Sequence, residues 1–461
     1  MRLLLDLPSS PEAREIYDLE DGQGERQAAM LYSLLGLRLA DMRVESLPSR
    51  GIQFRPARGA SRAEFSPRPP ERLVFSLRFP DLASLDEFAR TANSLAGASI
   101  GADLPIAAMD SWCPPRDRPP LFHIRERALA LVGAEALQAG GRPLMGEGVN
   151  IVMVDLGVNR AALSAIAPQA EFPGGWTVAQ GGQAVRVASP LQAPARGHGT
   201  MVASAVLSLA PRARIFDFPL LPDALTEVVA WTSWAHAALQ TIKADIEGGL
   251  AMDYPGPWVF CHAWGVYDRR MEQALPASVA SYTGNRDHVL NALIRALDAG
   301  GHDQVFAAGN GGQFSPHPRC GPEDTGPGRS IFGAACMPEV LTVGAVRADG
   351  TWIGYSSQGP GQPGFAAQPG AMVAKPDICA PSHFVDHADA GLLWSGTSAA
   401  CGLVAGAAAA LRGCGSPLAG LSTAALRQHL RQTARKPEGV AGGYDNRHGH
   451  GILDLRQALA V

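Results

Sequence analysis

The chain has 461 residues, a length that predicts one large domain together with a smaller one. Hydrophobic residues make up 46% and charged residues 18% of the sequence, which excludes a chain that is disordered throughout. The formal net charge of −4 argues against a generally basic nucleic-acid-binding protein, so we expect no nucleic-acid partner.

The sequence pattern gives no sign of a targeting or membrane segment. Asp6 interrupts the apolar run at the start of the chain, so we expect no secretory signal. Ala390–Leu411 is uncharged but consists mostly of Gly, Ala, Ser and Thr, which is too weakly apolar for a membrane span and predicts a closely packed buried helix. We therefore expect a cytoplasmic protein without a membrane partner.

The number and spacing of the cysteines predict that they are reduced thiols. They are odd in number and scattered, and none has the spacing of a metal site, so we expect neither a metal nor a cofactor. Cys320 and Cys336 flank a loop rich in Gly and Pro and form the one pair worth testing for a disulfide bridge. The seven cysteines are Cys113, Cys261, Cys320, Cys336, Cys379, Cys401 and Cys414.

The first 120 residues predict a small two-layer α/β unit. In chain order we expect a strand at Arg2–Leu7, a helix at Gly24–Ala40, an exposed loop at Pro48–Pro70, a strand at Leu73–Phe79, a helix at Asp81–Leu95, a closing strand at Ala98–Ala107 and a linker at Trp112–Pro120. Ser84 is the candidate N-cap of the second helix, with Glu87 as its capping-box partner. This order predicts a ferredoxin-like domain at residues 1–115 and a linker at residues 116–124.

From residue 121 onward, apolar strands alternate with helices. We predict strands at Val149–Val154, Ile215–Leu220, Trp258–His262, Gln304–Ala308 and Val340–Val346, and helices at Gly199–Leu209, Ala224–Ile246, His288–Ala299, Ala399–Arg412 and Thr423–Thr433. The strand at Val149–Val154 is almost entirely apolar, as expected for a strand buried on both faces. The alternation predicts a three-layer α/β domain with a mostly parallel sheet at residues 125–461.

Four polar residues stand at the ends of strands or the starts of helices. Asp155 ends a buried strand, His198 precedes a helix of small residues, Asn310 follows another strand, and Ser398 begins a second helix of small residues. Taken singly, each has a structural interpretation as a cap or an ion-pair partner. Taken together they match a chemical need, because a serine nucleophile requires a histidine base, an orienting carboxylate and donors for an oxyanion.

The motifs around these residues resemble those of the subtilisin-like serine proteases, the subtilases. They read, in chain order, VNIVMVDLGVN, GHGTMVASAV, VFAAGNGG and SGTSAACGLVAG. The similarity extends over about residues 125–461. It implies that Ser398 is the nucleophile, His198 the general base and Asp155 the residue that orients the imidazole. It also implies that Asn310 and the Ser398 backbone N–H form the oxyanion hole.

The resemblance implies a polypeptide substrate bound as an extended strand. Ala263, Trp264 and Gly265 are expected to pair with the substrate backbone, as are Ala307, Ala308 and Gly309. The expected reaction is peptide hydrolysis through an acyl-enzyme, by a serine endopeptidase that needs no cofactor.

Three residues depart from the family pattern. Leu156 stands where Ser or Thr is usual, so Asp155 is expected to lack one hydrogen bond, typically worth about 1 kcal/mol. Ala399 stands where Met is usual, and Gly402 where Pro is usual, which is expected to loosen the start of the serine helix. The calcium-binding loop common in the family is missing from the His198 helix, so no tight calcium site is expected there.

The N-terminal unit has two interpretations. It resembles the inhibitory propeptide of many subtilases in its order of elements, and a cut is then expected near Ala107–Pro120. It is otherwise a permanent accessory domain. An enzyme held latent by this unit until a regulatory partner or another protease acts is one hypothesis, and a catalytically silent subtilase fold that binds proteins is the alternative function.

Overall fold

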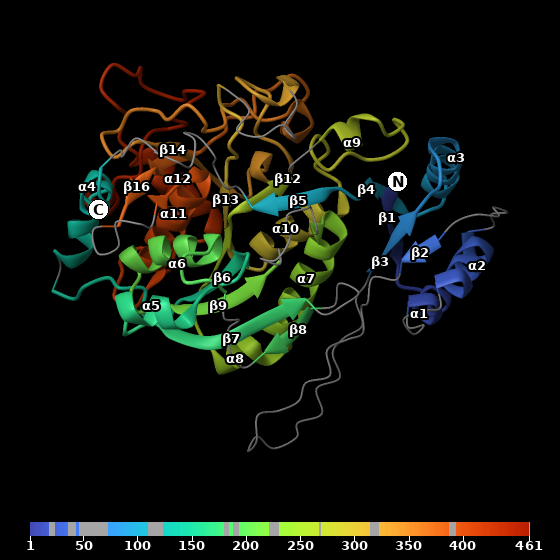
Figure 1. Cartoon of the computed structure of the whole chain (residues 1–461), viewed down its shortest axis with the longest axis horizontal. Helices are drawn as coiled ribbons and strands as arrows, with labels where there is room; N and C mark the ends of the chain where they lie inside the picture. Colours follow the sequence, from blue (N-terminus) through green and yellow to red (C-terminus); the bar gives the residue numbers. More distant parts are fainter. Residues whose placement is uncertain are drawn as a thin grey trace.

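The computed structural model describes residues 1–17, 24–35, 43–45, 72–108, 123–139, 141–178, 184–187, 193–220, 230–266, 269–313, 322–386 and 393–460, and Figure 1 shows the whole chain. The predicted loop Pro48–Pro70, the predicted linker Trp112–Pro120, Cys113 and Cys320 lie outside the described residues. So do residues 36–40 and 224–229 of two predicted helices.

The N-terminal unit is a four-stranded antiparallel sheet with helices between its strands, in the order β2-β3-β1-β4. Its elements are β1 (Arg2–Pro8), α1 (Pro11–Tyr17), α2 (Gly24–Leu35), β2 (Arg43–Glu45), β3 (Arg72–Arg78), α3 (Leu82–Asn93) and β4 (Ser99–Ala102). This arrangement confirms the predicted small ferredoxin-like fold. Figure 1 shows the unit in blue at the right of the molecule.

Both faces of this small sheet are covered. Alternate residues of β1, among them Leu3 and Leu5, belong to a core that includes Phe88 of α3. Leu4 points the other way and packs with Val74 and Val289, the latter from the large domain. Because side chains alternate along a strand, the same short sheet builds its own core and also docks on the large domain.

Two predictions for this unit were wrong. The N-cap of α3 is Asp81, whose carboxylate accepts a hydrogen bond from the Ser84 N–H at 2.8 Å. Ser84 is therefore the third helical residue, because Asp81 is an equally good cap three positions earlier. The single closing strand predicted at Ala98–Ala107 is divided into β4 and β5 (Pro105–Ala108), which belong to different sheets.

The large domain is built on an eight-stranded sheet whose first seven strands run parallel. In spatial order the strands are β15 (Ile378–Pro381), β14 (Leu341–Val346), β13 (Asp303–Ala307), β11 (Trp258–His262), β6 (Asn150–Asp155), β9 (Arg214–Pro219), β7 (Glu171–Val178) and the antiparallel edge strand β8 (Ala184–Val187). The mostly parallel sheet predicted from the sequence is thus confirmed.

The remaining elements surround this sheet. The helices of the large domain are α4 (Arg125–Leu131), α5 (Arg160–Ile166), α6 (His198–Leu209), α7 (Thr232–Asp245), α8 (Ala251–Asp253), α9 (Arg270–Gln273), α10 (Val289–Ala299), α11 (Gly396–Arg412), α12 (Thr423–Gln432) and α13 (Leu455–Ala458). The short strands are β10 (Ala230–Trp231), β12 (Trp264–Val266), β16 (Phe384–Val385) and β17 (Leu393–Trp394). The helix predicted from Ala224 begins only at Thr232, because β10 precedes it. No helix among the described residues is long and apolar enough to cross a membrane.

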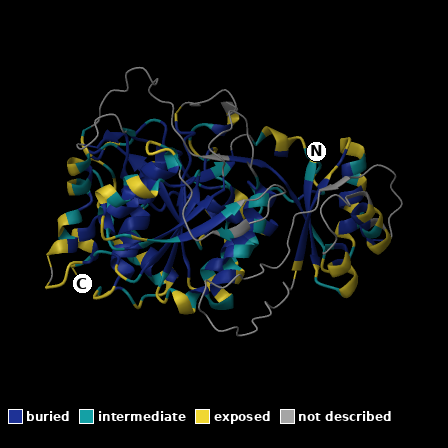
Figure 2. Cartoon of the chain, turned by 60° about the horizontal axis from the view of Figure 1, so that its bottom comes forward, coloured by how far each residue is buried: buried dark blue, intermediate teal, exposed yellow. Residues whose placement is uncertain are grey.

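The central strands contribute to two cores. In β6, Ile151 and Met153 join the core that contains α6 and α11, whereas Val152 and Val154 join the core that contains α7 and α10. Figure 2 shows buried residues in dark blue through the centre of the molecule. The sheet therefore lies between two helix layers, and its strands are apolar on both faces for that reason.

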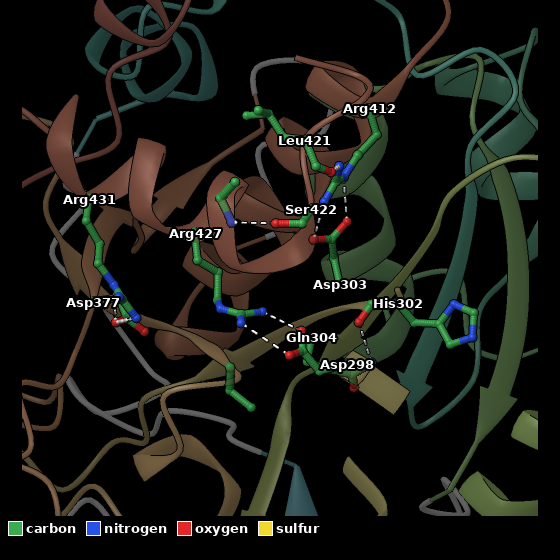
Figure 3. A network of polar contacts seen from close by, with 12 residues as sticks. Asp298, His302, Asp303, Gln304, Asp377, Arg412, Leu421, Ser422, Arg427 and Arg431 are labelled. Atoms are coloured by element: carbon green, nitrogen blue, oxygen red, sulfur yellow. Dashed lines mark hydrogen bonds and ion pairs between the residues drawn. The ribbon is translucent and has the colours of Figure 1, made fainter. Parts of the chain in front are cut away.

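Ion pairs tie α11 to the sheet and α12 to α10 (Figure 3). Arg412, at the end of α11, binds Asp303 with two hydrogen bonds of 2.7 and 2.9 Å. Arg427 of α12 pairs with Asp298 at 2.5 Å. Asp303 begins β13, so these contacts lie at the amino end of the parallel strands. Ligands bind at the opposite, carboxyl end of such sheets.

Candidate active site

Asp155 and His198 meet at the carboxyl end of the central strand. Asp155 is the last residue of β6 and is buried, and His198 is the first residue of α6. The His198 Nδ1 atom lies 2.6 Å from the Asp155 Oδ1 atom. A short contact of this kind fixes the orientation of the ring and directs the other ring nitrogen away from the carboxylate.

The two oxygens of Asp155 differ in their hydrogen bonds within the described part of the chain. The Leu156 backbone N–H donates to Oδ1 at 2.7 Å, while Oδ2 is buried and unpartnered among the described residues. A hydroxyl of Ser or Thr at position 156 could donate a hydrogen bond to an Asp155 oxygen, whereas the leucine side chain has no donor. This agrees with the sequence analysis, which predicted that Asp155 lacks one hydrogen bond.

Glycines bring the histidine and serine helices into backbone contact. A Cβ placed on Gly402 would lie 2.6 Å from the Val202 carbonyl oxygen, and one on Gly406 would lie 2.4 Å from that of Val206. Val202 is four residues after His198, and Gly402 is four residues after Ser398. Helices α6 and α11 therefore run side by side in the same direction, with His198 and Ser398 in their first turns.

This contact changes the interpretation of Gly402. The sequence analysis expected glycine at this position to loosen the start of the serine helix. Any side chain at Gly402 would collide with the Val202 carbonyl, so the residue is required by the close approach of the two helices. All of α11 from Gly396 to Arg412 is buried.

Thr397 fixes the amide of Asn310. The Asn310 Oδ1 atom accepts hydrogen bonds from the Thr397 N–H at 2.9 Å and from the Thr397 hydroxyl at 3.0 Å. Because a backbone N–H can only donate, the amide oxygen must face Thr397, and the Nδ2 donor faces the other way. Gly309 donates to the same threonine hydroxyl at 3.1 Å, which fixes the loop that carries Asn310.

An extended segment of the N-terminal unit lies beside Ser398. Strand β5 runs antiparallel to β12, with Ala107 opposite Gly265 and Ala108 opposite Trp264. The next residue of the large domain in this direction is Ala263, whose carbonyl oxygen lies 3.5 Å from the Ser398 Oγ atom. The strand therefore leads toward the serine. Figure 1 shows β5 beside β12, where it reaches from the N-terminal unit into the large domain.

The other neighbour of β5 is β10, which the sequence analysis did not assign to the site. Ile106 pairs with Ala230, and Pro105 pairs with Trp231, so β5 is the middle strand of a three-stranded sheet. A two-residue strand preceding a long helix has no periodic pattern, and only its hydrogen-bonded partner defines it.

The predicted residues Ala307 and Ala308 line a cavity together with Trp264 and Gly265. This cavity, which we name the Trp264 cavity, is also lined by Val266, Tyr282, Phe306, Ser330, Phe332 and Ala335. The pairing of a substrate with Ala307–Gly309 stays a prediction.

The comparison with protein families identifies the chain. The model of the subtilase family matches residues 183–451, which is more than half of the sequence. The chain belongs to the subtilase family. It is thus a member of a family of subtilisin-like serine peptidases. The matched region contains His198, Asn310 and Ser398. Asp155 lies before this region, and its proposed role in orienting His198 rests on the sequence resemblance and on their contact.

One solved structure with a TM-score above 0.5 shares the fold of this subtilase. Fervidolysin from Fervidobacterium pennivorans, a keratinolytic enzyme related to subtilisin, has a TM-score of 0.57 at 16% identity. The similarity covers 100% of this chain, which spans only 61% of the fervidolysin chain. Sphericase has a TM-score of 0.47 at 21% identity, covering 70% of this chain and 97% of its own. MycP1 from Mycobacterium smegmatis has a TM-score of 0.48 at 20% identity, covering 78% and 90%. No curated protein matches the sequence.

Two further histidines of this subtilase are structural. Burial lowers the pKa of His236 to about 3 and that of His262 to about 3, so both are neutral near pH 7. The His262 ring stacks on Phe306 with 4.0 Å between ring centres, and it contacts the Gln304 amide at 3.0 Å.

No group of three or more His, Cys, Asp or Glu side chains within the described ranges could hold a metal ion. Cys401 lies one turn after Ser398 and is buried 3.8 Å from Cys261, sulfur to sulfur. Both are free thiols, as is Cys336, the described member of the pair considered for a bridge.

The N-terminal unit is bound to the large domain by polar contacts. Asp103 accepts hydrogen bonds from the Thr232 hydroxyl at 3.1 Å and from the Ser233 N–H at 2.8 Å, at the start of α7. The His288 Nε2 atom lies 2.8 Å from the Ala102 carbonyl oxygen. Asp103 thus caps a helix that belongs to the other domain, a function that the sequence pattern did not reveal.

Proposed function

We propose that this subtilase is a serine endopeptidase that acts through an acyl-enzyme on Ser398. The Ser398 oxygen attacks the peptide carbonyl carbon while His198 takes the hydroxyl proton. His198 then gives that proton to the leaving amine as the C–N bond breaks. Water, activated by His198, hydrolyses the resulting ester. Asp155 orients the ring and stabilises its protonated form.

The Asn310 amide is proposed to stabilise the oxyanion together with the Ser398 backbone N–H. The two hydrogen bonds that Asn310 accepts from Thr397 support this role, because they leave the Nδ2 donor directed away from Thr397. The position of Ser398 in the first turn of α11 adds the positive end of a helix dipole beside the developing charge.

The observation that carries the proposal is the position of β5. An extended segment is held between β10 and β12 and leads toward Ser398. A polypeptide substrate bound in the same way gains backbone hydrogen bonds on both edges, which do not depend on its sequence. We therefore propose polypeptides as the substrates. A cytoplasmic location stays a prediction.

The position of β5 also supports the proposal that the N-terminal unit keeps the enzyme inactive. Because β5 occupies the place proposed for the substrate, the N-terminal unit blocks the site as long as it stays docked. We propose that residues 1–115 act as a propeptide-like inhibitory domain, joined through a linker at residues 116–124 to the peptidase domain at residues 125–461. A cut near Ala107–Pro120, or a regulatory partner that displaces the unit, would open the site.

The nucleophile is tested by labelling with a fluorophosphonate, followed by measurement of the intact mass. We expect one adduct on the wild-type chain and none on Ser398→Ala. The same spectrum shows whether about the first 115 residues are removed in wild type only. If the wild-type chain takes no label even after the N-terminal unit is displaced, the chain is a silent scaffold and the proposed reaction is wrong.

Latency is tested separately with Ile106→Asp in the full-length chain. Ile106 is buried between β10 and β12. Burying an unpaired carboxylate there costs free energy, so β5 should leave the site. We expect at least tenfold faster hydrolysis of an unfolded protein than by the matched control Ile106→Val. Equal rates for the two variants would show that β5 does not restrain the enzyme.

A further inference from the structure

The backbone around Gly396 places the proposed nucleophile. Gly396 is the first residue of α11, two positions before Ser398, and has a φ of +72°. This φ lies in the left-handed region, which glycine adopts without strain. The preceding residue, Ser395, is extended, and its side chain forms no capping hydrogen bond within the described residues. The direction in which Ser398 leaves this turn therefore depends on what holds the two peptide groups of Gly396.

Two buried hydroxyl groups hold the peptide groups on either side of Gly396. The Gly396 N–H donates to the Tyr355 hydroxyl oxygen at 3.1 Å, and the Gly396 carbonyl accepts from the Ser382 hydroxyl at 2.6 Å. The two hydroxyl oxygens lie 2.7 Å apart, and both residues are buried. These three hydrogen bonds among Tyr355, Ser382 and Gly396 form a closed set, which we name the Gly396 ring.

The direction of each hydrogen bond in the Gly396 ring follows from the available protons. Ser382 has one hydroxyl proton, and the Gly396 carbonyl takes it. The contact between the two hydroxyls must then be a donation from Tyr355 to the Ser382 oxygen. The Gly396 N–H donates back to Tyr355 and closes the ring. Each group in such a ring polarises the next, and removal of one hydroxyl leaves buried polar groups without a partner.

Both hydroxyls belong to segments that are tied to the central sheet. Ser382 follows β15, and its N–H donates to the carbonyl of Val346, the last residue of β14, at 2.8 Å. The residue after Tyr355 is Ser356, whose hydroxyl accepts from the Ala345 N–H of β14 at 2.8 Å. These contacts fix the two hydroxyls to the carboxyl end of the sheet, where the proposed catalytic residues lie.

The segment that contains Tyr355 also holds the loop that carries Asn310. The Tyr355 carbonyl accepts from the Gly312 N–H at 2.9 Å, and the Ser357 N–H donates to the Gly309 carbonyl at 2.9 Å. The loop is thus bound on both sides of Asn310. One short segment therefore sets the position of the proposed oxyanion-hole side chain relative to the turn that carries the nucleophile.

We propose that Tyr355 and Ser382 are positioning residues for the nucleophile. Through the Gly396 ring they fix the turn from which Ser398 attacks, and Tyr355 also keeps that turn in register with Asn310 through its backbone. This inference rests on the proposed function, because it assigns further residues to the same reaction. A displacement of about 1 Å can cost about 100-fold in rate, so the two hydroxyls affect the chemical step and not the binding of the substrate.

The rate of fluorophosphonate labelling tests the role of the Tyr355 hydroxyl. The parent is the full-length chain with Ile106→Asp, which frees the site, and Tyr355→Phe removes only the hydroxyl. We expect about tenfold slower labelling and an about tenfold lower kcat for an unfolded protein substrate, with KM unchanged. An unchanged kcat, or a change confined to KM, would overturn the proposal.

The matched control is Tyr444→Phe, which removes a hydroxyl that also bonds to the backbone. The Tyr444 hydroxyl donates to the Lys375 carbonyl at 2.6 Å and does not belong to the Gly396 ring. We expect labelling and kcat to stay at the parent level in this control, and both variants to unfold at similar urea concentrations. An equal loss of rate in the two variants would show a general effect of a lost hydroxyl and contradict the positioning role.

The Gly396 ring itself is tested with Ser382→Ala, alone and together with Tyr355→Phe. Each change opens the same ring, so their effects should not multiply. We expect the double variant to be labelled at a rate within about twofold of that of the slower single variant. A loss of about 100-fold, the product of two tenfold effects, would mean that the hydroxyls act independently and would refute the ring.

Hydrogen exchange separates this proposal from the proposed reaction, because it needs no chemistry at the site. In the Ser398→Ala chain, the amides of Gly396 and Thr397 should exchange about tenfold faster with Tyr355→Phe than with Tyr444→Phe. Equal exchange would overturn the proposal even in an active enzyme. If the parent that retains Ser398 takes no label at all, the proposed reaction is wrong, and the exchange result alone decides whether the hydroxyls fix the turn.

Discussion

Two packing surfaces of this subtilase differ in the interactions that hold their two sides together. Helices α6 and α11 meet through backbone, with Gly402 and Gly406 against the carbonyl groups of Val202 and Val206. The N-terminal unit meets the large domain through apolar packing of Leu4 and Val74 on Val289, together with hydrogen bonds centred on Asp103 and His288.

The difference has a functional meaning. A close-packed surface of small residues cannot open without creating a void, so α6 and α11 separate only when the domain unfolds. Hydrogen bonds at a docking surface can be exchanged for bonds to water, so their net contribution is modest. The first surface fixes His198 relative to Ser398. The second holds a strand in the site in a way that permits release.

The largest effect is expected from a side chain on the first surface. Gly406→Val would place a Cβ 2.4 Å from the Val206 carbonyl oxygen, and its two methyl groups need still more room. We expect the free energy of unfolding to fall by about 3 kcal/mol or more, measured by urea denaturation. Gly248→Ala is the control, because no atom lies within 4 Å of a Cβ there. Similar losses in both variants would contradict the close contact.

A smaller effect is expected at the second surface from Asp103→Asn. The aspartate accepts hydrogen bonds from Arg2, Ser76, Thr232 and Ser233, and an amide would turn a donor toward some of these donors. We expect docking of the N-terminal unit to weaken by about 2 kcal/mol, or about 30-fold. The readout is hydrogen exchange of the β4 amides in the Ser398→Ala chain, which cannot cleave itself.

The control for this change is Asp81→Asn, which makes the same chemical substitution within the same unit. Asp81 caps α3, where asparagine is an equally good cap. Exchange in β4 should then stay at the level of the parent chain. Faster exchange in both variants would mean that the amide weakens the unit itself and not its docking.

The second surface should also respond to pH. Burial lowers the pKa of His288 to about 4, and the contact with the Ala102 carbonyl and the charge of Asp103 act in the opposite direction. Below the ordinary histidine value of about 6.5, the undocked state takes up the proton first, so docking is strongest above that pH and weakens as pH falls toward 4. We expect about tenfold weaker docking at pH 5.5 than at pH 7.5.

This pH effect is measured as the exchange rate of the β4 amides, corrected for the intrinsic pH dependence of exchange. His288→Gln keeps a side-chain donor for the Ala102 carbonyl and cannot be protonated, so it should lose most of the dependence. An unchanged pH profile in His288→Gln would assign the effect to another group.

The smallest effect concerns Asp155, on the first surface. Leu156→Ser offers a hydroxyl to the unpartnered Oδ2 atom, and one such hydrogen bond is worth about 1 kcal/mol. We expect kcat for peptide hydrolysis to rise about fivefold if the bond orients Asp155. Leu156→Ala removes the same side chain without adding a hydroxyl, so it should show no rise.

The sequence by itself determined most of the central parallel strands, the long helices that cover them and the two-domain α/β class. The strand Trp258–His262, for example, is buried at every residue, and all of its residues except the last are apolar. This pattern is visible in the sequence because both faces of the strand are covered. The four motifs carried Asp155, His198, Asn310 and Ser398, because each stands where a strand ends or a helix begins.

Only the tertiary structure decided the features that depend on distant partners. Strand β10 has two residues and exists because β5 pairs with it. Glycine is required at position 402 because the Val202 carbonyl oxygen lies against it, which only the fold shows. Tyr282 lines the Trp264 cavity, and its contacts with Glu272 and the Gly333 backbone are seen only in the fold. Periodicity records which face of an element is buried, but it does not record what that face meets, and these residues act through what they meet.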